Sequence, residues 1–471
     1  MSSGKKIAVF AVASLLIFIS RSGESLWAQE EQPATDGVKT ITRWPDPVVM
    51  KAEVLPKELL GSLISNLRLY AYRDGKFAPI LFQIDEMTEE GDWVLPEGKK
   101  NNANLGNGIL DPQDVLLFMV SDTGDRAEKE KWLEGFAGGI EIEVVDPLTG
   151  GKGWCYFLHF PTNPPSLSSQ SPYVHYDHEN ESIQTDYFQS KYIITKDGLH
   201  SSYYEYEIMP PSAGGCGKNY VDRLKIRPRY KIRFLPTIRL NEENLSSDVL
   251  AYKRGPIRVV RRVEQWAGMF FNVKLMRTFS DVCQYRNTTT VPVTVHIPGS
   301  FQKLVLKEAV IRFGTDYGPN ALGSMTYNSN NLQGFVVDGK MDDGEEDFNP
   351  APDTWRVLTG SCGTFMTRSL FPDPIEGFEV KMGLIDDQKD KDPPEQSPGN
   401  IGYMWQDWDL TSAKGFVGDY RFYLEFSHPP NYQLGDEVPY LNYIDHPLKL
   451  IIGENKVDNQ PLLSAQIGKG F

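Results

Sequence analysis

One stretch of the chain alternates between basic and apolar residues. Residues 223–234 read RLKIRPRYKIRF, which places cations at every second position: Arg223, Lys225, Arg227, Arg229, Lys231 and Arg233. A period of two puts these six cations on one face of an extended strand and the apolar residues on the other face. The pattern therefore predicts a β-strand about 33 Å long. Because Pro228 cannot donate a ladder hydrogen bond, it indicates a sheet edge or a bulge near the middle.

The rest of the chain has the same β character. It holds 41 glycines and 32 prolines, which separate short runs rich in Val, Ile, Tyr and Phe. Helical spacing of apolar residues is confined to short segments, of which Lys57–Asn66 and Asp125–Glu134 are the best helix candidates. Many short strands between turn residues favour an all-β fold made of two β-sandwich-type domains.

Composition divides the chain into five parts. The basic pair Lys5 and Lys6, the apolar run 7–19 and the small residue Ala28 are typical of a signal peptide over residues 1–28. Residues 29–40 are expected to be a flexible leader. Residues 41–162 are predicted to form an N-terminal β-sandwich, and residues 163–185, rich in Pro and Ser, a linker. Residues 186–471 are expected to form a larger β-domain of the supersandwich type.

The N-terminal signal predicts an extracytoplasmic protein, either periplasmic or secreted. Its apolar core is shorter than the roughly 20 residues that span a bilayer, so we expect no membrane span after cleavage. The four cysteines, Cys155, Cys216, Cys283 and Cys362, allow up to two disulfides in such a compartment. Their spacing does not choose among the three connectivities.

The segment 101–117 (NNANLGNGILDPQDVLL) resembles the second half of a calcium-binding loop. Asn107, Asp111 and Asp114 stand at positions that carry oxygen ligands, and Gly108 stands at the tight turn between them. Ala103 and Leu105 occupy positions where Asp or Asn would be expected. The sequence thus predicts either a structural calcium site or an ordinary Asn-Gly turn with solvated acids.

Charge is unevenly distributed along the chain. Between Tyr220 and Ser280, fourteen Lys and Arg residues face five acids, whereas the whole chain has a net charge of −15. In one interpretation the basic strand pairs with acidic strands of the same protein, with Glu205 and Glu207 as candidates. In the other, it binds an acidic glycan or a partner protein. An extracytoplasmic location makes nucleic acid an unlikely anion.

Few residues qualify as catalytic groups. His175 and His178 lie three positions apart and could supply two metal ligands, but they lie in a polar linker segment, and solvated loop histidines are the favoured interpretation. His200 precedes a Tyr-rich strand, and a histidine with nearby Tyr and Arg side chains is what a polysaccharide lyase of β-fold would need as base, acid and cation. The catalytic residues stay unknown at this level, and so does whether the protein is an enzyme.

Three short motifs suggest a relationship. The phrases PILFQIDE (79–86), NGILDPQDVLLF (107–118) and GPIRVVRRVEQW (255–266) resemble a group of uncharacterised secreted bacterial proteins. That resemblance implies β-sandwich or supersandwich folds near carbohydrate-processing enzymes. The leading hypothesis is therefore a secreted carbohydrate-binding or carbohydrate-active β-protein that favours acidic glycans. The alternative is a non-catalytic structural or accessory component of an extracytoplasmic assembly.

Overall fold

The computed structural model describes residues 37–234, 236–269, 273–297, 306–371, 376–412, 418–453 and 455–460. The predicted signal peptide, the leader up to residue 36 and residues 461–471 lie outside the described residues. The end of the leader is bound to the N-terminal sandwich, because Thr40 N donates to Lys152 O at 2.8 Å.

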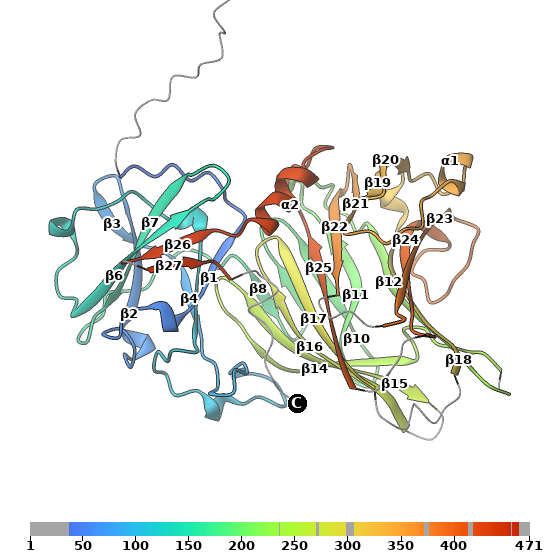
Figure 1. Ribbon diagram of the computed structural model, residues 1–471, viewed down its shortest axis with the longest axis horizontal. Helices are drawn as coiled ribbons and strands as arrows, with labels where there is room; N and C mark the ends of the chain where they lie inside the picture. The colour runs from blue at the N-terminus through green and yellow to red at the C-terminus, as the bar shows by residue number, and fades with distance from the viewer. Residues whose placement is uncertain are drawn as a thin grey trace, which may run out of the picture.

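The N-terminal unit is a sandwich of two antiparallel sheets, at the left of Figure 1. Its strands are β1 (Pro47–Lys51), β2 (Leu67–Arg73), β3 (Lys76–Pro79), β4 (Phe82–Asp85), β5 (Val115–Met119), β6 (Gly138–Val145), β7 (Lys152–His159), β26 (Lys449–Ile452) and β27 (Asn455–Asp458). The smaller sheet has the order β1-β5-β4 and the larger one β27-β26-β6-β7-β2-β3. Met50, Phe118 and Phe157 belong to the apolar core of this unit.

The chain returns to this unit near its C-terminal end. Strand β26 pairs with β6 from Lys449 opposite Val145 to Ile452 opposite Ile142. Figure 1 shows both red strands lying on the N-terminal unit. Residues 449–458, which the sequence analysis assigns to the second domain, thus complete the sheet of the first.

The second unit contains three further sheets. Its strands are β8 (His175–Asp177), β9 (Ser182–Gln184), β10 (Gln189–Ile194), β11 (His200–Ile208), β12 (Val221–Ile232), β13 (Ile238–Arg239), β14 (Leu245–Lys253), β15 (Val259–Met269), β16 (Val273–Gln284), β17 (Thr288–Ile297), β18 (Leu306–Tyr317), β19 (Met325–Asn328), β20 (Asn331–Val336), β21 (Arg356–Gly360), β22 (Gly363–Leu370), β23 (Glu379–Asp387), β24 (Asn400–Asp409) and β25 (Gly418–Ser427). The helices are α1 (Asp343–Glu346) and α2 (Glu437–Asp445). The prediction of an all-β fold with sandwich-type units is confirmed.

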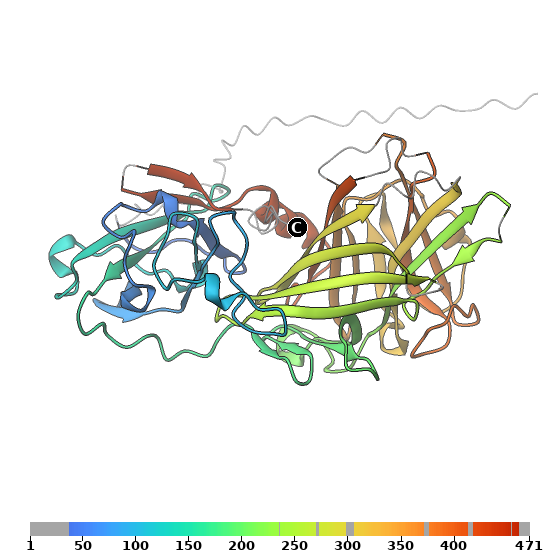
Figure 2. The same ribbon diagram turned by 90° about the horizontal axis from the view of Figure 1, so that it is seen from below.

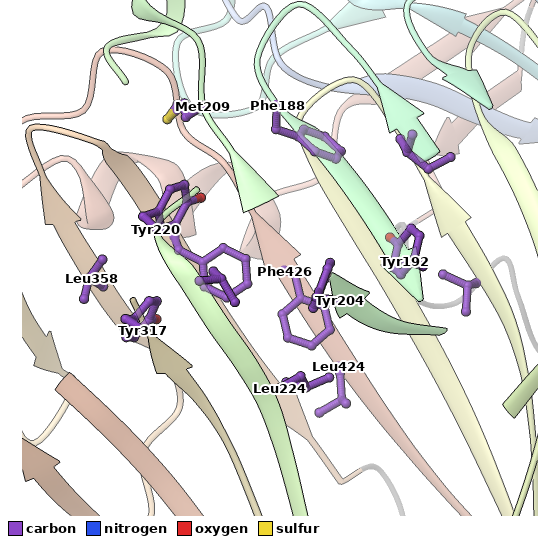
Figure 3. Close-up of a cluster of buried hydrophobic side chains, with 14 of the residues drawn as sticks. Phe188, Tyr192, Tyr204, Met209, Tyr220, Leu224, Tyr317, Leu358, Leu424 and Phe426 are labelled. Atoms are coloured by element: carbon purple, nitrogen blue, oxygen red, sulfur yellow. The ribbon is translucent and has the colours of Figure 1, made fainter. Parts of the chain in front are cut away.

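Two large sheets of the second unit enclose its core. The nine-stranded sheet runs β14-β15-β16-β17-β25-β22-β21-β19-β20, and the five-stranded sheet runs β13-β12-β18-β24-β23. A four-stranded sheet, β11-β10-β9-β8, packs beside them. Figure 3 shows Leu224 of β12 beside Leu424 and Phe426 of β25 in the apolar cluster. In Figure 2 the long strands β14 to β17 extend from the N-terminal unit to the far end of the second unit.

Several local expectations differ from the structure. The second half of the predicted linker forms β8 and β9, because Tyr176 and Ile183 are buried in the core. The helix predictions at Lys57–Asn66 and Asp125–Glu134 are wrong, since these segments hold only single 3-10 turns at Ile64–Asn66 and Lys129–Lys131. Asp125 instead forms an isolated β-bridge with Tyr72 of β2, next to the bridge between Gly124 and Trp154 of β7.

The junction between the two units is built on a sheet that is buried on both faces. All five residues of β5 are buried, with Leu116 and Phe118 in the core of the N-terminal unit. On the opposite face, Val115 and Leu117 share a cluster with Ile257 from the second unit. The continuous apolar run VLLFM is explained by this arrangement, because a strand covered on both faces has no polar side.

The motifs that carry the family resemblance meet at this junction. Gln83 Oε1 accepts hydrogen bonds from Ile257 N and Arg258 N, both at 3.0 Å. A Cβ at Gly255 would lie 2.0 Å from Gln83 Oε1, so glycine allows this backbone segment to approach the Gln83 side chain closely. Arg258 Nε donates to Asp85 Oδ2 at 2.7 Å, with both side chains fully buried. These motifs therefore hold the two units together.

The cysteines form one disulfide in the described part of the chain. Cys216 is bonded to Cys362, whereas Cys155 and Cys283 are free and buried. Among the helices of the described residues, none has the length and hydrophobicity to cross a bilayer.

Candidate functional site

A buried glutamate lies at the centre of the most chemically diverse cluster in the described residues. Glu181 lies in the turn between β8 and β9, and its φ of 50° places it in the left-handed region that non-glycine residues rarely adopt. Its carboxylate is fully buried. Tyr176 Oη donates to it at 3.0 Å and 2.9 Å from the two oxygens. The turn thus places the Glu181 carboxylate in the protein interior, where a buried charge requires hydrogen-bond or ion-pair partners.

Two histidines are among the partners of the Glu181 carboxylate. The Nδ1 atom of His200, the first residue of β11, is 2.8 Å from Glu181 Oε2. The Nδ1 atom of His178 is 3.4 Å from the same oxygen. The two imidazole rings stack with their centroids 4.2 Å apart and their planes 21° apart. Their side chains are 27% and 20% exposed for His178 and His200, so solvent and ligands reach both.

A buried arginine balances the charge of Glu181. Nη2 of Arg261, on β15, lies 2.9 Å from Glu181 Oε1. The guanidinium is 4.2 Å from the ring centre of Tyr192 and 5.3 Å from that of Tyr176. Burial by itself opposes the charge of Arg261, but Glu181 and the two tyrosines outweigh it and raise the arginine pKa. The cluster therefore holds a permanent ion pair beneath the two histidines.

The N-terminal unit contributes the rim of this site. A loop at residues 97–100 pairs with β14, where Glu97 N donates to Tyr252 O and Lys100 N to Leu250 O. Gly98, with φ of 101°, allows the contact because a Cβ there would lie 2.7 Å from the Ala251 Cα. Through this loop the junction between the units becomes one wall of the site.

Charged and aromatic side chains surround the opening. The ring of Tyr252 lies 4.6 Å from that of His178, and the Arg254 guanidinium lies 5.9 Å from the Tyr252 ring. Lys99 Nζ is 2.6 Å from Asp248 Oδ2, and Asp248 Oδ1 accepts a hydrogen bond from His200 N. The surroundings of the imidazoles thus combine a buried tyrosine ring with exposed cations that are paired with acids.

The hydrogen bonds indicate which nitrogen of His200 is free to react. A carboxylate can only accept, so His200 Nδ1 must carry the proton it shares with Glu181. The remaining nitrogen, Nε2, then has its lone pair available as a base. The pKa of His178 is lowered by burial and by His200, which favours a neutral ring beside it. A carboxylate-oriented imidazole of this kind suits general acid–base chemistry.

The same residues also have the composition of a transition-metal site. One ligand atom from each of His178, Glu181 and His200 lies within 4.8 Å of the others. Two nitrogens and one oxygen are a typical zinc ligand set. The lone pair of an imidazole nitrogen lies in the ring plane, however, and the planes of two nearly parallel stacked rings do not meet at one ion. The arrangement therefore fits a hydrogen-bonded proton relay better than a tetrahedral ion.

Sequence reasoning reached this site only in part. It named His200 with nearby Tyr and Arg side chains, and the structure brings Tyr176 and Arg261 to it. The expectation of solvated loop histidines is wrong for His178, whereas His175 is exposed. Glu181 was missed, and no local pattern marks it, because its neighbours in the polar segment 177–181 are mostly exposed.

The six cations of the basic strand differ in burial and pairing. In its first half, Lys225 is fully buried, 2.8 Å from Asp316 Oδ2, and donates to Asn400 Oδ1 at 2.6 Å. Arg227 is paired with Glu242, and Arg223 is half-buried. For Lys225 and Arg227, the structure has the intramolecular pairing that one interpretation expected, but with other acids than Glu205 and Glu207.

The outer half of the strand differs. Arg229 Nε donates to Glu308 Oε1 at 2.6 Å, and Lys231 and Arg233 are exposed. Backbone pairing places Arg229 opposite Arg239, so the exposed cations gather where β12 ends. The six cations thus do not form one continuous open row.

The calcium-type loop is closed by hydrogen bonds among its own groups. Asn107 Nδ2 donates to Asp111 Oδ2 at 2.8 Å, and Asn107 Oδ1 accepts from Ile109 N. The two oxygens of Asp114 accept from Met87 N and Asp111 N. Burial raises the pKa of Asp114 to about 6. Calcium binding by Asn107, Asp111 and Asp114 stays a prediction.

The fold and the site define an all-β protein of two antiparallel sandwich units with a histidine–glutamate cluster where they meet. No protein-family model and no curated protein matches the chain. Among solved structures, a "putative aldose 1-epimerase" from Klebsiella pneumoniae is similar, with a TM-score of 0.31 and 9% identity. The match covers 62% of this chain and 89% of that chain. A likeness of this extent carries no inference about activity.

Proposed function

We propose that the protein is a carbohydrate-active enzyme that acts on acidic glycans, with His178, Glu181 and His200 as its acid–base centre. The observation that carries the proposal is the 2.8 Å contact between His200 Nδ1 and Glu181 Oε2, beneath a second accessible imidazole. Buried carboxylates that hold an imidazole in this way leave its other nitrogen as a base near neutral pH.

The chemistry that this arrangement suits is β-elimination on a uronate. His200 Nε2 would take the proton from the carbon next to the carboxylate, and the electron pair left behind would form a carbon–carbon double bond. The glycosidic carbon–oxygen bond on the adjacent carbon would break. The departing oxygen would then take the proton from the His200 imidazolium, so that His200 acts first as base and then as acid. No oxidant or cofactor is needed for this step.

The rim supports an acidic substrate. A uronate carboxylate must be neutralised before the neighbouring proton becomes acidic enough to remove. Lys99, Lys100 and Arg254 are exposed cations beside the cluster. Each is paired with an acid, namely Asp248, Glu264 and Glu97, with which a uronate would have to compete.

An extracytoplasmic location is part of the proposal. The signal-peptide pattern in residues 1–28 motivates it. The disulfide between Cys216 and Cys362 supports it, since such bonds persist mainly in oxidising compartments.

The test is a cleavage assay on acidic polysaccharides such as alginate, polygalacturonate, hyaluronan and heparin. Elimination is read from the ultraviolet absorbance of the unsaturated product, and hydrolysis from new reducing ends. His200→Ala and Glu181→Gln should lower the rate on the active substrate by at least about 100-fold. His175→Ala is the control, because His175 lies on β8, just before the turn that holds Glu181, but is exposed.

Two outcomes would contradict the proposal. One is a His200→Ala variant that retains the wild-type rate. The other is binding of acidic glycans without cleavage of any of them, which would favour the non-catalytic accessory role.

A further inference from the structure

A hollow lies between the two large sheets of the second unit. Its volume is about 180 Å³. Its walls are mostly apolar, with Leu224 and Ile226 from β12, Phe313 from β18, Trp408 from β24, and Phe422 and Leu424 from β25. Figure 3 shows the inner end of this region, where Leu224 and Leu424 lie close together. Arg261 and Tyr192 belong to the wall as well, so the hollow lies beside the histidine cluster.

The burial of the wall residues shows where the hollow opens. On β25, Leu424 and Phe426 are buried, whereas Phe422 and Tyr420 are half-buried. Strand β16 has the same gradient, because Val282 is buried and Thr278 is half-buried. The register of the sheets places the more exposed residues at the end where β12 finishes and β18 begins. The hollow is therefore closed near the histidine cluster, and among the described residues its wall is most exposed at the opposite end, here called the accessible end.

A hollow of this size needs an explanation. Protein interiors are packed as densely as organic crystals, with few voids larger than a water molecule. An engineered apolar cavity of about 150 Å³ stays dry and binds apolar molecules. The hollow in the second unit is larger and accessible, so an apolar guest that fills it would gain contacts that water cannot supply.

Cations gather at the accessible end. Pro228 lines the hollow, and Lys231 and Arg233 follow it on β12 within about 16 Å, on the outer face of the strand. The exposed cations at this end are Lys231, Arg233, Arg239, Lys307 and Arg421. Phe234, next to Arg233, is 89% exposed. An exposed aromatic ring among basic residues is typical of a surface that meets lipid headgroups.

The acids at the same end offset this positive charge only in part. Glu308 is paired with Arg229, and Glu379 lies 3.9 Å from Lys381. Asp409 accepts a hydrogen bond from Thr411 N, which does not neutralise its charge, and Glu376 is exposed. Among the described residues, the five exposed cations outnumber these four acids.

We propose that this hollow binds the acyl chain of an anionic single-chain lipid, and that the exposed cations at the end of β12 bind its headgroup. The apolar wall favours binding of the acyl chain, and the positive charge at the accessible end favours an anionic headgroup over a cationic one. The inference does not depend on the proposed glycan chemistry, because none of the residues varied to test it belongs to the histidine cluster.

The first experiment is calorimetric titration of the full mature chain with decanoate, dodecanoate and tetradecanoate below their micelle concentrations. Each further CH₂ group that enters the hollow should strengthen binding about four-fold, so dodecanoate should bind about fifteen-fold more tightly than decanoate. Dodecyltrimethylammonium, with the same chain and the opposite charge, should bind at least about five-fold more weakly than dodecanoate. Equal affinity for all chain lengths would overturn the proposal.

Two sets of variants locate the site. Ile226→Trp fills the hollow and should abolish binding, whereas Leu332→Trp adds the same ring at an exposed position of β20 and should leave binding unchanged. Lys231→Glu with Arg233→Glu should weaken binding of dodecanoate at least about five-fold. Lys57→Glu with Lys129→Glu makes the same charge change on the N-terminal unit and should have no effect. Circular dichroism melting of each variant checks that it is folded.

A last arm distinguishes membrane lipid from free lipid. Co-sedimentation with phosphatidylglycerol vesicles that Phe234→Asp abolishes would identify a membrane as the source. Binding of dodecanoate without co-sedimentation would identify free amphiphile as the source. An Ile226→Trp variant that is folded and binds dodecanoate like the wild type would refute the hollow as the site.

Discussion

The guanidinium of Arg258 and the carboxylate of Asp85 form a fully buried ion pair across the junction of the two units, with Nε 2.7 Å from Oδ2. Lys253 Nζ approaches the other oxygen of Asp85 at 2.8 Å. The Arg258 guanidinium also lies 4.4 Å from the ring centre of Trp93, and its Nη1 donates to Tyr285 Oη. The Asp85 carboxylate on β4 thus binds one side chain from β14 and one from the segment just before β15.

Loss of this carboxylate should destabilise the fold strongly. Asp85→Asn leaves two buried cations without a counter-charge, and breaking a buried pair in this way costs about 3–5 kcal/mol. The measurement is the free energy of unfolding in denaturant. Asp458→Asn is the control, because Asp458 and Lys449 are exposed and 3.9 Å apart. That change should cost less than about 1 kcal/mol, and an equal loss in both variants would contradict the role of burial.

The same residue predicts a dependence of stability on pH. Burial by itself would raise the pKa of Asp85, but Lys253 and Arg258 outweigh it and lower the pKa to about 2. Because the folded state holds the proton less tightly than the unfolded state, this contribution is complete above about pH 4 and is lost as pH falls toward about 2.

The difference in stability between the wild type and Asp85→Asn should therefore narrow by about 2–3 kcal/mol between about pH 5 and about pH 2. Denaturant melts at several pH values measure it. A difference that stays constant over this range would show that the Asp85 pKa is not lowered.

The disulfide predicts a second stability effect. Cys216 and Cys362 are separated by 146 positions. Closing a loop of that length reduces the conformational entropy of the unfolded chain, which raises the free energy of unfolding by about 5 kcal/mol at room temperature. Cys216→Ser with Cys362→Ser should lower the melting temperature accordingly. Cys155→Ser tests a buried free thiol in the other unit. Non-reducing peptide mapping should recover the pair 216–362, and a different pair would refute the assignment.

Calcium at the loop 107–114 is the fourth prediction. Backbone amides already occupy both oxygens of Asp114, so an ion must compete with them for ligands. We expect a weak site, filled at millimolar calcium as in extracellular modules. Calcium should raise the melting temperature in a saturable way, and Asp111→Asn should remove the effect. An unchanged melting temperature with calcium and with chelator would exclude the site.

Much of the β structure could be predicted from local patterns. The alternation of residues 67–73 (LRLYAYR) falls on β2, and the alternation that begins at Arg223 falls on β12. These patterns are readable because the period of two is a property of one strand alone. The helix candidates failed because Lys57–Asn66 and Asp125–Glu134 are too short to be stable without tertiary support.

The candidate site could be predicted only in fragments. His178 and Glu181 are close in sequence, but their partner Arg261 lies on β15, and only the packing of β15 against the four-stranded sheet brings it to Glu181. The pairing of β26 with β6 in the first sheet could not be predicted from local patterns either, because the two strands are far apart in the sequence.

Period-two alternation along the chain is enough to predict a protein rich in strands and, around residues 223–234, a strand with a basic face, which is β12 (Val221–Ile232). The role of that face depends on how distant segments pack against it. Lys225 and Arg227 lie against Asp316 and Glu242, which come from distant segments, whereas Lys231 and Arg233 reach solvent. The physical reason is that the interaction between charges depends on their separation in space and on burial, and neither follows from spacing along the chain.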